Sequence, residues 1–148
     1  MSETNGVLPL RLQAIVDEFS LAEGREKLDL LLEFAESLPP LPPRLADRQD
    51  SMDQVHECMT PVFVLAELID GRLTFYFDVP LESPTVRGYA ALMAEGVNGA
   101  TPADVLAIPA DFFQAMGLRE VISMQRLNGI SAILAHMKRL AVETLPTA

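Results

Sequence analysis

A short turn between two apolar runs places the tightest limit on how this chain of 148 residues can fold. The turn is Asp70-Gly71, a dipeptide that favours the two-residue connection of an antiparallel hairpin. The run before it, Val62 to Ile69, is almost entirely apolar, which predicts a largely buried strand. The run after it, Arg72 to Asp78, alternates apolar and polar residues, which predicts a strand with one face in the core. The sequence therefore predicts an antiparallel β-hairpin.

Helices are predicted on both sides of this hairpin. Apolar residues recur at helical spacing over 8–19 and over 28–38, and the proline-rich run 39–43 stops the second helix. After the hairpin, Ser83-Pro84 is typical of an N-cap followed by a first-turn proline, and this helix is expected to end near Asn98-Gly99. The remaining helical segments are a short one that begins at Thr101-Pro102, one over 110–116 closed by Gly117, and a final one after Ser123. This order predicts an α+β fold, with several helices packed against a small antiparallel sheet.

The composition narrows the classes of function. Hydrophobic residues make up 49% and charged residues 22%, so the chain has the material for a folded core. The length predicts a single domain over 1–148, with its core at about 8–142. The formal net charge of −10 argues against nucleic acid and acidic membranes as partners, because both need a basic surface. No secretory signal is visible in 1–7 and no apolar run is long enough to cross a membrane, which predicts a cytoplasmic protein.

The chain has one cysteine, Cys58, at the point where a polar loop gives way to the first predicted strand. A lone thiol forms no internal disulfide and lacks the paired cysteines of a structural zinc site, so its chemistry would involve a second molecule. In extended backbone His56 would share a face with Cys58, whereas Glu57 would point away. Two interpretations stay open: a reactive thiol that transfers a group between partners, and a small buried hydrophobic residue, the usual state of a free cysteine.

A second candidate segment begins the last predicted helix. Arg126 falls in its first turn, where a cation opposes the helix dipole, and this placement suits an anion or a thiolate nearby. Asn128 and Gly129 follow inside the helix, where glycine costs about 1 kcal/mol relative to alanine unless another backbone approaches closely. The alternative is an exposed arginine and a glycine used for packing, and the sequence does not decide between the two.

Other kinds of chemistry are poorly supported. A cysteine hydrolase needs a histidine base and a third group that orients it. His56 is a candidate base, but no oxyanion-hole signature accompanies Cys58, and His136, close to two basic residues at 138–139, is expected at the surface. The histidines and the cysteine lack metal-ligand spacing, and the acidic residues of 47–53 are expected in a solvated loop. No glycine-rich phosphate loop is present, so we expect neither a metal nor a nucleotide cofactor.

Short motifs that are weak one by one become specific in combination, from about Leu12 to Leu140. They are Pro39-Pro40-Leu41-Pro42; Val55-His56-x-Cys58; Val86-Arg87-Gly88; Gly99-x-Thr101-Pro102-x-Asp104-Val105-Leu106; Phe112-Phe113-x-x-Met116-Gly117-Leu118; and Ser123-x-x-Arg126-x-Asn128-Gly129. In this order and spacing the chain closely resembles the SufE family of sulfur-acceptor proteins. The resemblance implies the same α+β fold that the periodicity predicts.

The resemblance implies a specific role for Cys58. It would accept a persulfide sulfur from a pyridoxal-phosphate (PLP)-dependent cysteine desulfurase of the SufS type, stimulating that enzyme, and pass the sulfur to an iron–sulfur cluster assembly scaffold of the SufB type. The protein would hold no cofactor of its own and would not be an independent turnover enzyme. Arg126, Asn128 and Gly129 match the family motif that packs near the cysteine loop, and with His56 they are the expected supporting residues. Alternatives are a non-catalytic regulatory module for a desulfurase, and a cysteine-dependent hydrolase.

The cysteine loop departs from the family pattern. Many members have Gly-Cys-Gln-Ser where this chain has Glu57-Cys58-Met59-Thr60 followed by Pro61. Loss of the glycine and the nearby proline stiffen the loop. Val55, Met59 and Val62 are expected to shield the thiol in the free protein, and the polar stretch before them would let the loop swing out.

Overall fold

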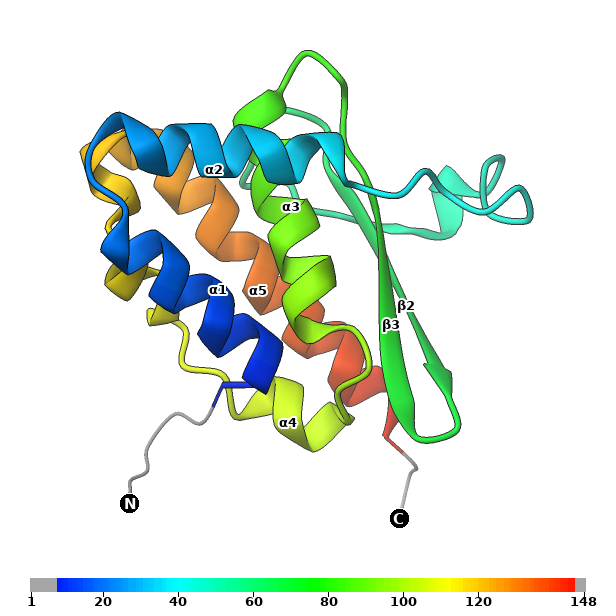
Figure 1. The fold of residues 1–148 in the computed structure, drawn as a ribbon. Helices are drawn as coiled ribbons and strands as arrows, with labels where there is room; N and C mark the ends of the chain where they lie inside the picture. The colour runs from blue at the N-terminus through cyan, green and yellow to red at the C-terminus, as the bar shows by residue number, and fades with distance from the viewer. Residues whose placement is uncertain (1–7, 146–148) are drawn as a thin grey trace.

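The computed structural model describes residues 8–145, in which helices pack against one side of a three-stranded antiparallel sheet (Figure 1). The elements in chain order are α1 (Leu10–Leu21), α2 (Arg25–Glu36), the 3-10 helix η1 (Gln49–Ser51), β1 (Asp53–Gln54), β2 (Phe63–Ile69), β3 (Arg72–Asp78), α3 (Pro84–Val97), α4 (Pro102–Leu106), the 3-10 helices η2 (Phe112–Met116) and η3 (Leu118–Glu120), and α5 (Met124–Thr144). This arrangement confirms the predicted α+β fold class. The segment 1–7, expected to carry no secretory signal, lies outside the described residues.

The hairpin forms where the sequence predicts it, but its first strand is less buried than expected. Val64 is buried, whereas Leu68 and Ile69 are 41% and 53% exposed. β2 and β3 pair antiparallel, with Ile69 opposite Arg72 at the turn. Asp70 and Gly71 both take positive φ, 52° and 80°, which is the backbone of the type I′ turn that favours glycine. The alternation along β3 places its apolar side chains in the core: Leu73, Phe75 and Phe77.

The short strand β1 is absent from the sequence-based prediction. Its residues Asp53 and Gln54 pair with Val64 and Phe63 of β2. Two polar residues show no alternation, so only the pairing with β2 makes them a strand. The last part of the polar segment that the sequence assigns to a solvated loop therefore joins the sheet at its edge, and it leads directly into the cysteine loop.

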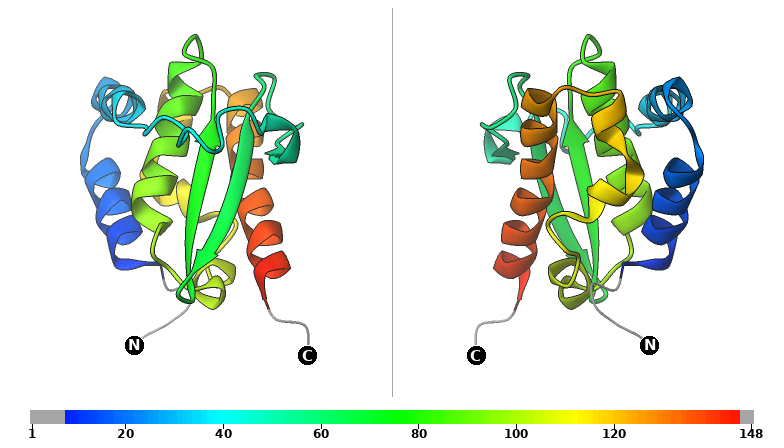
Figure 2. Two further views of the ribbon diagram at one scale, coloured as in Figure 1. Left: turned by 90° about the vertical axis from the view of Figure 1, so that its right-hand side faces the viewer. Right: turned by 90° about the vertical axis from the view of Figure 1, so that its left-hand side faces the viewer.

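Two helices cover one face of the sheet, and two more pack beyond them (Figures 1 and 2). α3 lies against β3 and α5 lies against β2, while α1 and α2 pack on α3. Gly88 permits a close approach between α3 and α2, because a Cβ at this position would overlap the backbone carbonyl oxygen of Leu31. The first turns of α3 and α5 lie at the end of the molecule that carries the cysteine loop.

The helix predicted over 110–116 is shorter than expected, and it is not an α-helix. It is a 3-10 helix over Phe112–Met116, whose backbone N–H groups bond three residues back. Gly117 has a left-handed conformation, with φ of 70°, and ends the segment before a regular α-helix can form.

Candidate functional site

The cysteine loop, residues 55–62, is fixed at its base. The Val55 N–H donates to the Val62 carbonyl at 2.8 Å, and both side chains are fully buried. The Cys58 N–H donates to the Val55 carbonyl at 3.2 Å, which closes a turn at the start of the loop. The sheet and the core therefore hold the two ends of the loop, and its tip carries the thiol.

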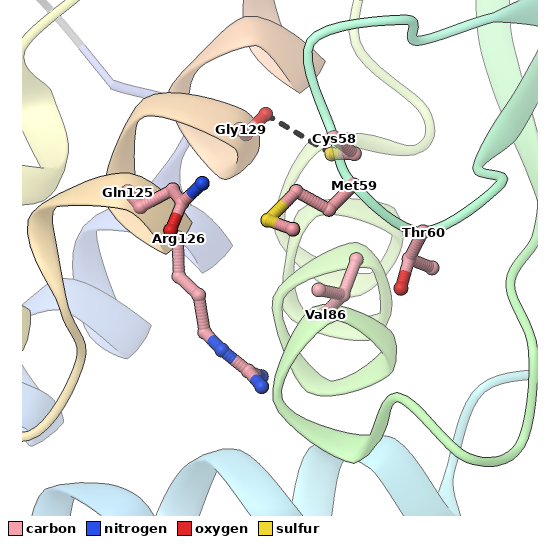
Figure 3. A pocket seen from close by; sticks show the side chains of 7 residues that line it. All are labelled: Cys58, Met59, Thr60, Val86, Gln125, Arg126 and Gly129. Carbon is pink, nitrogen blue, oxygen red and sulfur yellow. Dashed lines mark hydrogen bonds between the residues drawn. The ribbon is translucent and has the colours of Figure 1, made fainter.

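Cys58 lies directly against α5. Its Sγ donates a hydrogen bond to the Gly129 carbonyl oxygen at 3.2 Å (Figure 3). A Cβ on residue 129 would stand 3.2 Å from the Cys58 Cα and 3.3 Å from its Sγ, which is closer than ordinary contact between such atoms. Gly129 thus serves a close backbone approach, which accounts for a poor helix former inside α5.

A cavity of about 260 Å³ opens beside the thiol (Figure 3). Its lining comes from the loop tip, the first turn of α3 and the first turns of α5. The lining residues are Cys58, Met59, Thr60, Val86, Gln125, Arg126 and Gly129. The thiol therefore borders an open space and is not sealed in the core.

The expected shield around the thiol forms only in part. Val55 and Val62 are buried beneath the loop, but Met59 is 82% exposed and leaves the sulfur partly open. The loop tip is held by Thr60, whose hydroxyl shares a hydrogen bond of 2.7 Å with the Ser83 hydroxyl at the start of α3. Ser83, predicted to cap α3, makes no side-chain cap bond to that helix and binds the loop instead.

The thiol is held in its protonated form in this conformation. Burial, and after it the negative charge of Glu57, raise the pKa of the Cys58 thiol from 9.0 to about 11. The thiolate is the nucleophilic form, so this thiol is a poor nucleophile at neutral pH. The thiolate support predicted for His56 and Arg126 does not outweigh these two effects here, and it stays a prediction for a conformation in which the loop has moved.

Arg126 shares the cavity with Cys58, but its guanidinium is engaged elsewhere. Its backbone N–H donates to the N-cap hydroxyl of Ser123 at 3.3 Å, which fixes the first turn of α5. Its Nη1 donates to Thr85 Oγ1 at 2.7 Å, and Figure 3 shows the side chain pointing away from the thiol. Arg126 thus joins the first turns of α5 and α3 and stands where a group entering the cavity would meet it.

The other predicted supporting residues lie outside the cavity. His56 and Asn128 are both exposed, and neither contributes to the cavity lining. The structure therefore brings Cys58, Arg126 and Gly129 together and leaves His56 and Asn128 at the neighbouring surface.

A polar cluster that the sequence analysis missed lies further along α5. The side chain of His136, expected at the surface, is only 12% exposed: its Nε2 is 3.0 Å from Glu57 Oε1 and its Nδ1 contacts Asp53 Oδ2. Arg139 contacts the same Asp53 carboxylate. His136 follows Gly129 by two helical turns and so lies on the same face of α5, the one sequence signal that places it near the cysteine loop.

The described residues, 8–145, contain no group of three or more His, Cys, Asp or Glu side chains placed to hold a metal ion. Within the same range, no helix is both long and apolar enough to cross a membrane.

Similarity to known proteins extends over most of the chain. The family model SufE, an Fe-S metabolism associated domain, matches residues 13–141. An uncharacterized SufE-like protein of Mycobacterium tuberculosis is 44% identical over 133 residues, which cover 89% of this chain and 92% of the relative. The cysteine desulfuration protein SufE of Plasmodium vivax is 23% identical over 109 residues, 72% of this chain and 42% of the relative.

Fold comparison gives the same result. The solution structure of a hypothetical protein from Thermus thermophilus matches with a TM-score of 0.84 and 34% identity, over 95% of this chain and 100% of that one. These matches confirm both the predicted family and the predicted fold. The chain belongs to the SufE family, whose domain is associated with iron–sulfur metabolism.

Proposed function

We propose that this protein is a single-domain sulfur acceptor. Cys58 takes a persulfide sulfur from a SufS-type, PLP-dependent cysteine desulfurase and passes it to a SufB-type iron–sulfur scaffold. The observation that carries the proposal is the chain's only thiol, half-buried at the edge of a cavity and bound to α5 at Gly129. The name of the Plasmodium vivax relative, a cysteine desulfuration protein, supports the same chemistry. We place this role in the cytoplasm, where reducing conditions keep a single thiol free.

The transfer needs one nucleophilic step. The Cys58 thiolate attacks the terminal sulfur of the persulfide on the desulfurase. A new S–S bond forms on Cys58 as the S–S bond of the donor breaks, and the donor cysteine leaves as a thiolate. The transferred sulfur keeps its oxidation state, so the step needs no external oxidant or reductant. Its one requirement of this chain is that Cys58 loses its proton and reaches the donor.

In the closed loop, with Cys58 bound to Gly129 of α5, the thiol is better protected than it is placed for sulfur transfer. With a pKa of about 11 the Cys58 thiol stays protonated at neutral pH, which slows oxidation and attack on unintended partners. Movement of the loop away from Gly129 would bring the sulfur out of its half-buried position and remove the main cause of the raised pKa. We infer that docking of the desulfurase supplies this movement, so that the thiol becomes reactive only where a persulfide donor is present.

The cavity gives the transferred sulfur a place to reside. Its volume of about 260 Å³ beside Cys58 accommodates an added sulfur atom while the loop is closed. Arg126 lines this cavity, and its guanidinium can exchange the Thr85 hydroxyl for a charged persulfide, because hydrogen bonds to an anion are the stronger ones. His56 would support the thiolate once the loop is open, and Asn128 is proposed as a supporting residue on the family motif alone.

Mass spectrometry of the intact protein tests the proposal. After incubation with a SufS-type desulfurase and free cysteine, we expect the wild type to gain one sulfur atom and Cys58→Ala to gain none. Stimulation of the desulfurase separates a carrier from a regulatory module, because a carrier loses it in Cys58→Ser and a regulator keeps it. An equal sulfur gain in wild type and Cys58→Ala, or full stimulation by Cys58→Ser, contradicts the acceptor role.

A further inference from the structure

Charged side chains gather where the cysteine loop meets the second half of α5. The His136 cluster consists of Asp53, Glu57, His136 and Arg139. His136 Nε2 lies 3.0 Å from Glu57 Oε1, and His136 Nδ1 contacts Asp53 Oδ2. Arg139 reaches the same Asp53 oxygen and comes within 3.2 Å of His136 Nδ1. One imidazole therefore bridges the cysteine loop and the edge strand β1.

Hydrogen bonds from this imidazole to both carboxylates at once require an N–H on each ring nitrogen. Each of its ring nitrogens faces a carboxylate oxygen, and an ionised carboxylate only accepts hydrogen bonds. A neutral imidazole has a single N–H and could donate to Asp53 or to Glu57, but not to both. The Glu57 backbone N–H, and then His136, lower the pKa of Glu57; burial acts to raise the pKa of Asp53, but hydrogen bonds from His136 and Arg139 leave it lowered. Both acids are thus ionised at neutral pH, one against each ring nitrogen of His136.

The His136 cluster gives the cysteine loop a second attachment to α5. Glu57 immediately precedes Cys58, and His136 follows Gly129 by two turns of the helix. The loop is therefore bound to α5 at two points, Cys58 to Gly129 and Glu57 to His136. The Glu57 side chain is 56% exposed, so solvent or a partner can reach this contact, while Asp53 and Arg139 keep the imidazole in place.

We propose that His136 is a positioning residue for the cysteine loop: its contact with Glu57 holds the loop closed, and release of Glu57 lets the thiol leave α5. Asp53 and Arg139 orient the imidazole for that contact. His136 does not line the cavity, so it acts on Cys58 through Glu57. The proposal rests on the proposed function, because it names the residues that govern loop opening for sulfur transfer.

Labelling of Cys58 in the free, full-length protein tests this without a desulfurase. An uncharged reagent, methyl methanethiosulfonate, reports how often the thiol is exposed. We expect His136→Gln to label roughly three- to tenfold faster than wild type, the effect of losing a partly exposed charged hydrogen bond. Glu57→Gln should be at least as fast, and the double variant should label like Glu57→Gln, since both changes remove one contact. Glu33→Gln, which removes an exposed carboxylate of α2 away from the cluster, should label like wild type.

The sign of the His136→Gln effect separates loop release from electrostatics. The change removes a hydrogen-bond partner of the Glu57 carboxylate, and a less compensated Glu57 charge disfavours the thiolate, which on its own would slow labelling. The double variant separates loop release from packing, because the His136→Gln effect should vanish in the Glu57→Gln background only if it acts through the Glu57 contact. The charged groups that face the pair are Asp53, Arg139 and His56, and all are retained in the variant.

Several results would overturn the proposal. They are labelling of His136→Gln at or below the wild-type rate with urea unfolding unchanged, and additive effects in the double variant. If His136→Gln loses stability, Glu57→Gln decides the matter, because it changes an exposed side chain on the loop. Its rate is compared with wild type at equal thiolate fraction, since loss of the Glu57 charge by itself favours the Cys58 thiolate. Wild-type labelling at equal thiolate fraction counts against the proposal. Failure of the acceptor role shows separately, as absence of sulfur on Cys58 after incubation with the desulfurase, whatever the labelling rates.

Discussion

Replacing Gly129 with alanine should open the cysteine loop and leave the fold intact. Within α5 the change favours the helix by about 1 kcal/mol, because glycine is the poorer helix former. The new Cβ would stand 3.2 Å from the Cys58 Cα, 3.3 Å from its Sγ and 3.4 Å from the Glu57 carbonyl oxygen. The first two distances lie a few tenths of an ångström inside ordinary contact, so the loop has to move.

The size of the expected effect depends on how much of the overpacking the loop relieves by moving away from α5. Overpacking in a rigid core costs about 1–3 kcal/mol, but the loop avoids most of it by leaving α5, which costs the Cys58–Gly129 hydrogen bond and the Glu57–His136 contact, about 0.5–1.5 kcal/mol each. We therefore expect the closed form to lose about 1–2 kcal/mol relative to the open form, a roughly 5- to 30-fold rise in the open population. The free energy of unfolding should stay within about 1 kcal/mol of wild type, because the helix gain offsets the lost contact.

The assay pairs two measurements on one variant: the rate at which an uncharged thiol reagent labels Cys58, and the free energy of unfolding in urea. Ser131→Ala is the matched control, since it also favours the α5 helix and loses only a local hydrogen bond to the Asn128 carbonyl. Faster labelling in Gly129→Ala alone supports the reasoning. Unchanged labelling refutes it, and so does faster labelling that comes only with a loss of several kcal/mol in global stability.

Three further changes have defined outcomes. The Cys58 thiol has a pKa of 9.0 when unperturbed and about 11 in the fold, so the unfolded chain releases this proton first; its stabilising contribution is complete below pH 9.0 and is lost as the pH rises to about 11. Urea unfolding of wild type and Cys58→Ser should diverge over that range, and parallel curves would contradict the raised pKa. Gly88→Ala should destabilise the fold by about 1–3 kcal/mol or more, because its Cβ meets the Leu31 backbone; a wild-type melting temperature would disprove the close packing of α2 on α3. Lys27→Met should cost about 1.5–3 kcal/mol, because the buried Nζ donates at 2.6 Å and 2.8 Å to carbonyl groups at the end of α1. Thermal unfolding checks this too, and no loss would show that those carbonyls need no donor.

The hairpin and the helices could be predicted because their signals are local. Asp70-Gly71 specifies its turn without a distant partner, and the helical spacing of apolar residues reports burial within one segment. β1 could not be found this way, since its two polar residues become a strand only by pairing with β2. The end of the 110–116 segment at Gly117 could also be predicted, because the glycine signal is local. The type of helix could not, since a segment this short forms 3-10 instead of α-helical hydrogen bonds.

The site was predictable only in part. Cys58 stood out as the sole thiol, and the family motif pointed to Arg126 and Gly129, which the structure places around the same cavity. No local signal shows that Cys58 contacts a residue 71 positions away, or that His136 binds Glu57 across 79 positions. Such contacts depend on how the loop folds back on α5, and a histidine beside basic residues has the same local sequence whether solvent or two carboxylates surround it.

The central claim is that Cys58 carries sulfur, and site-resolved mass spectrometry with isotopically labelled cysteine tests it most directly. The wild-type protein, a SufS-type desulfurase and cysteine that contains a heavy sulfur isotope are mixed, trapped with an alkylating reagent and digested. We predict heavy sulfur on the peptide that contains Cys58, and its loss when a SufB-type scaffold is added. Heavy sulfur that stays on the desulfurase, while Cys58 remains an unmodified thiol, would contradict the account.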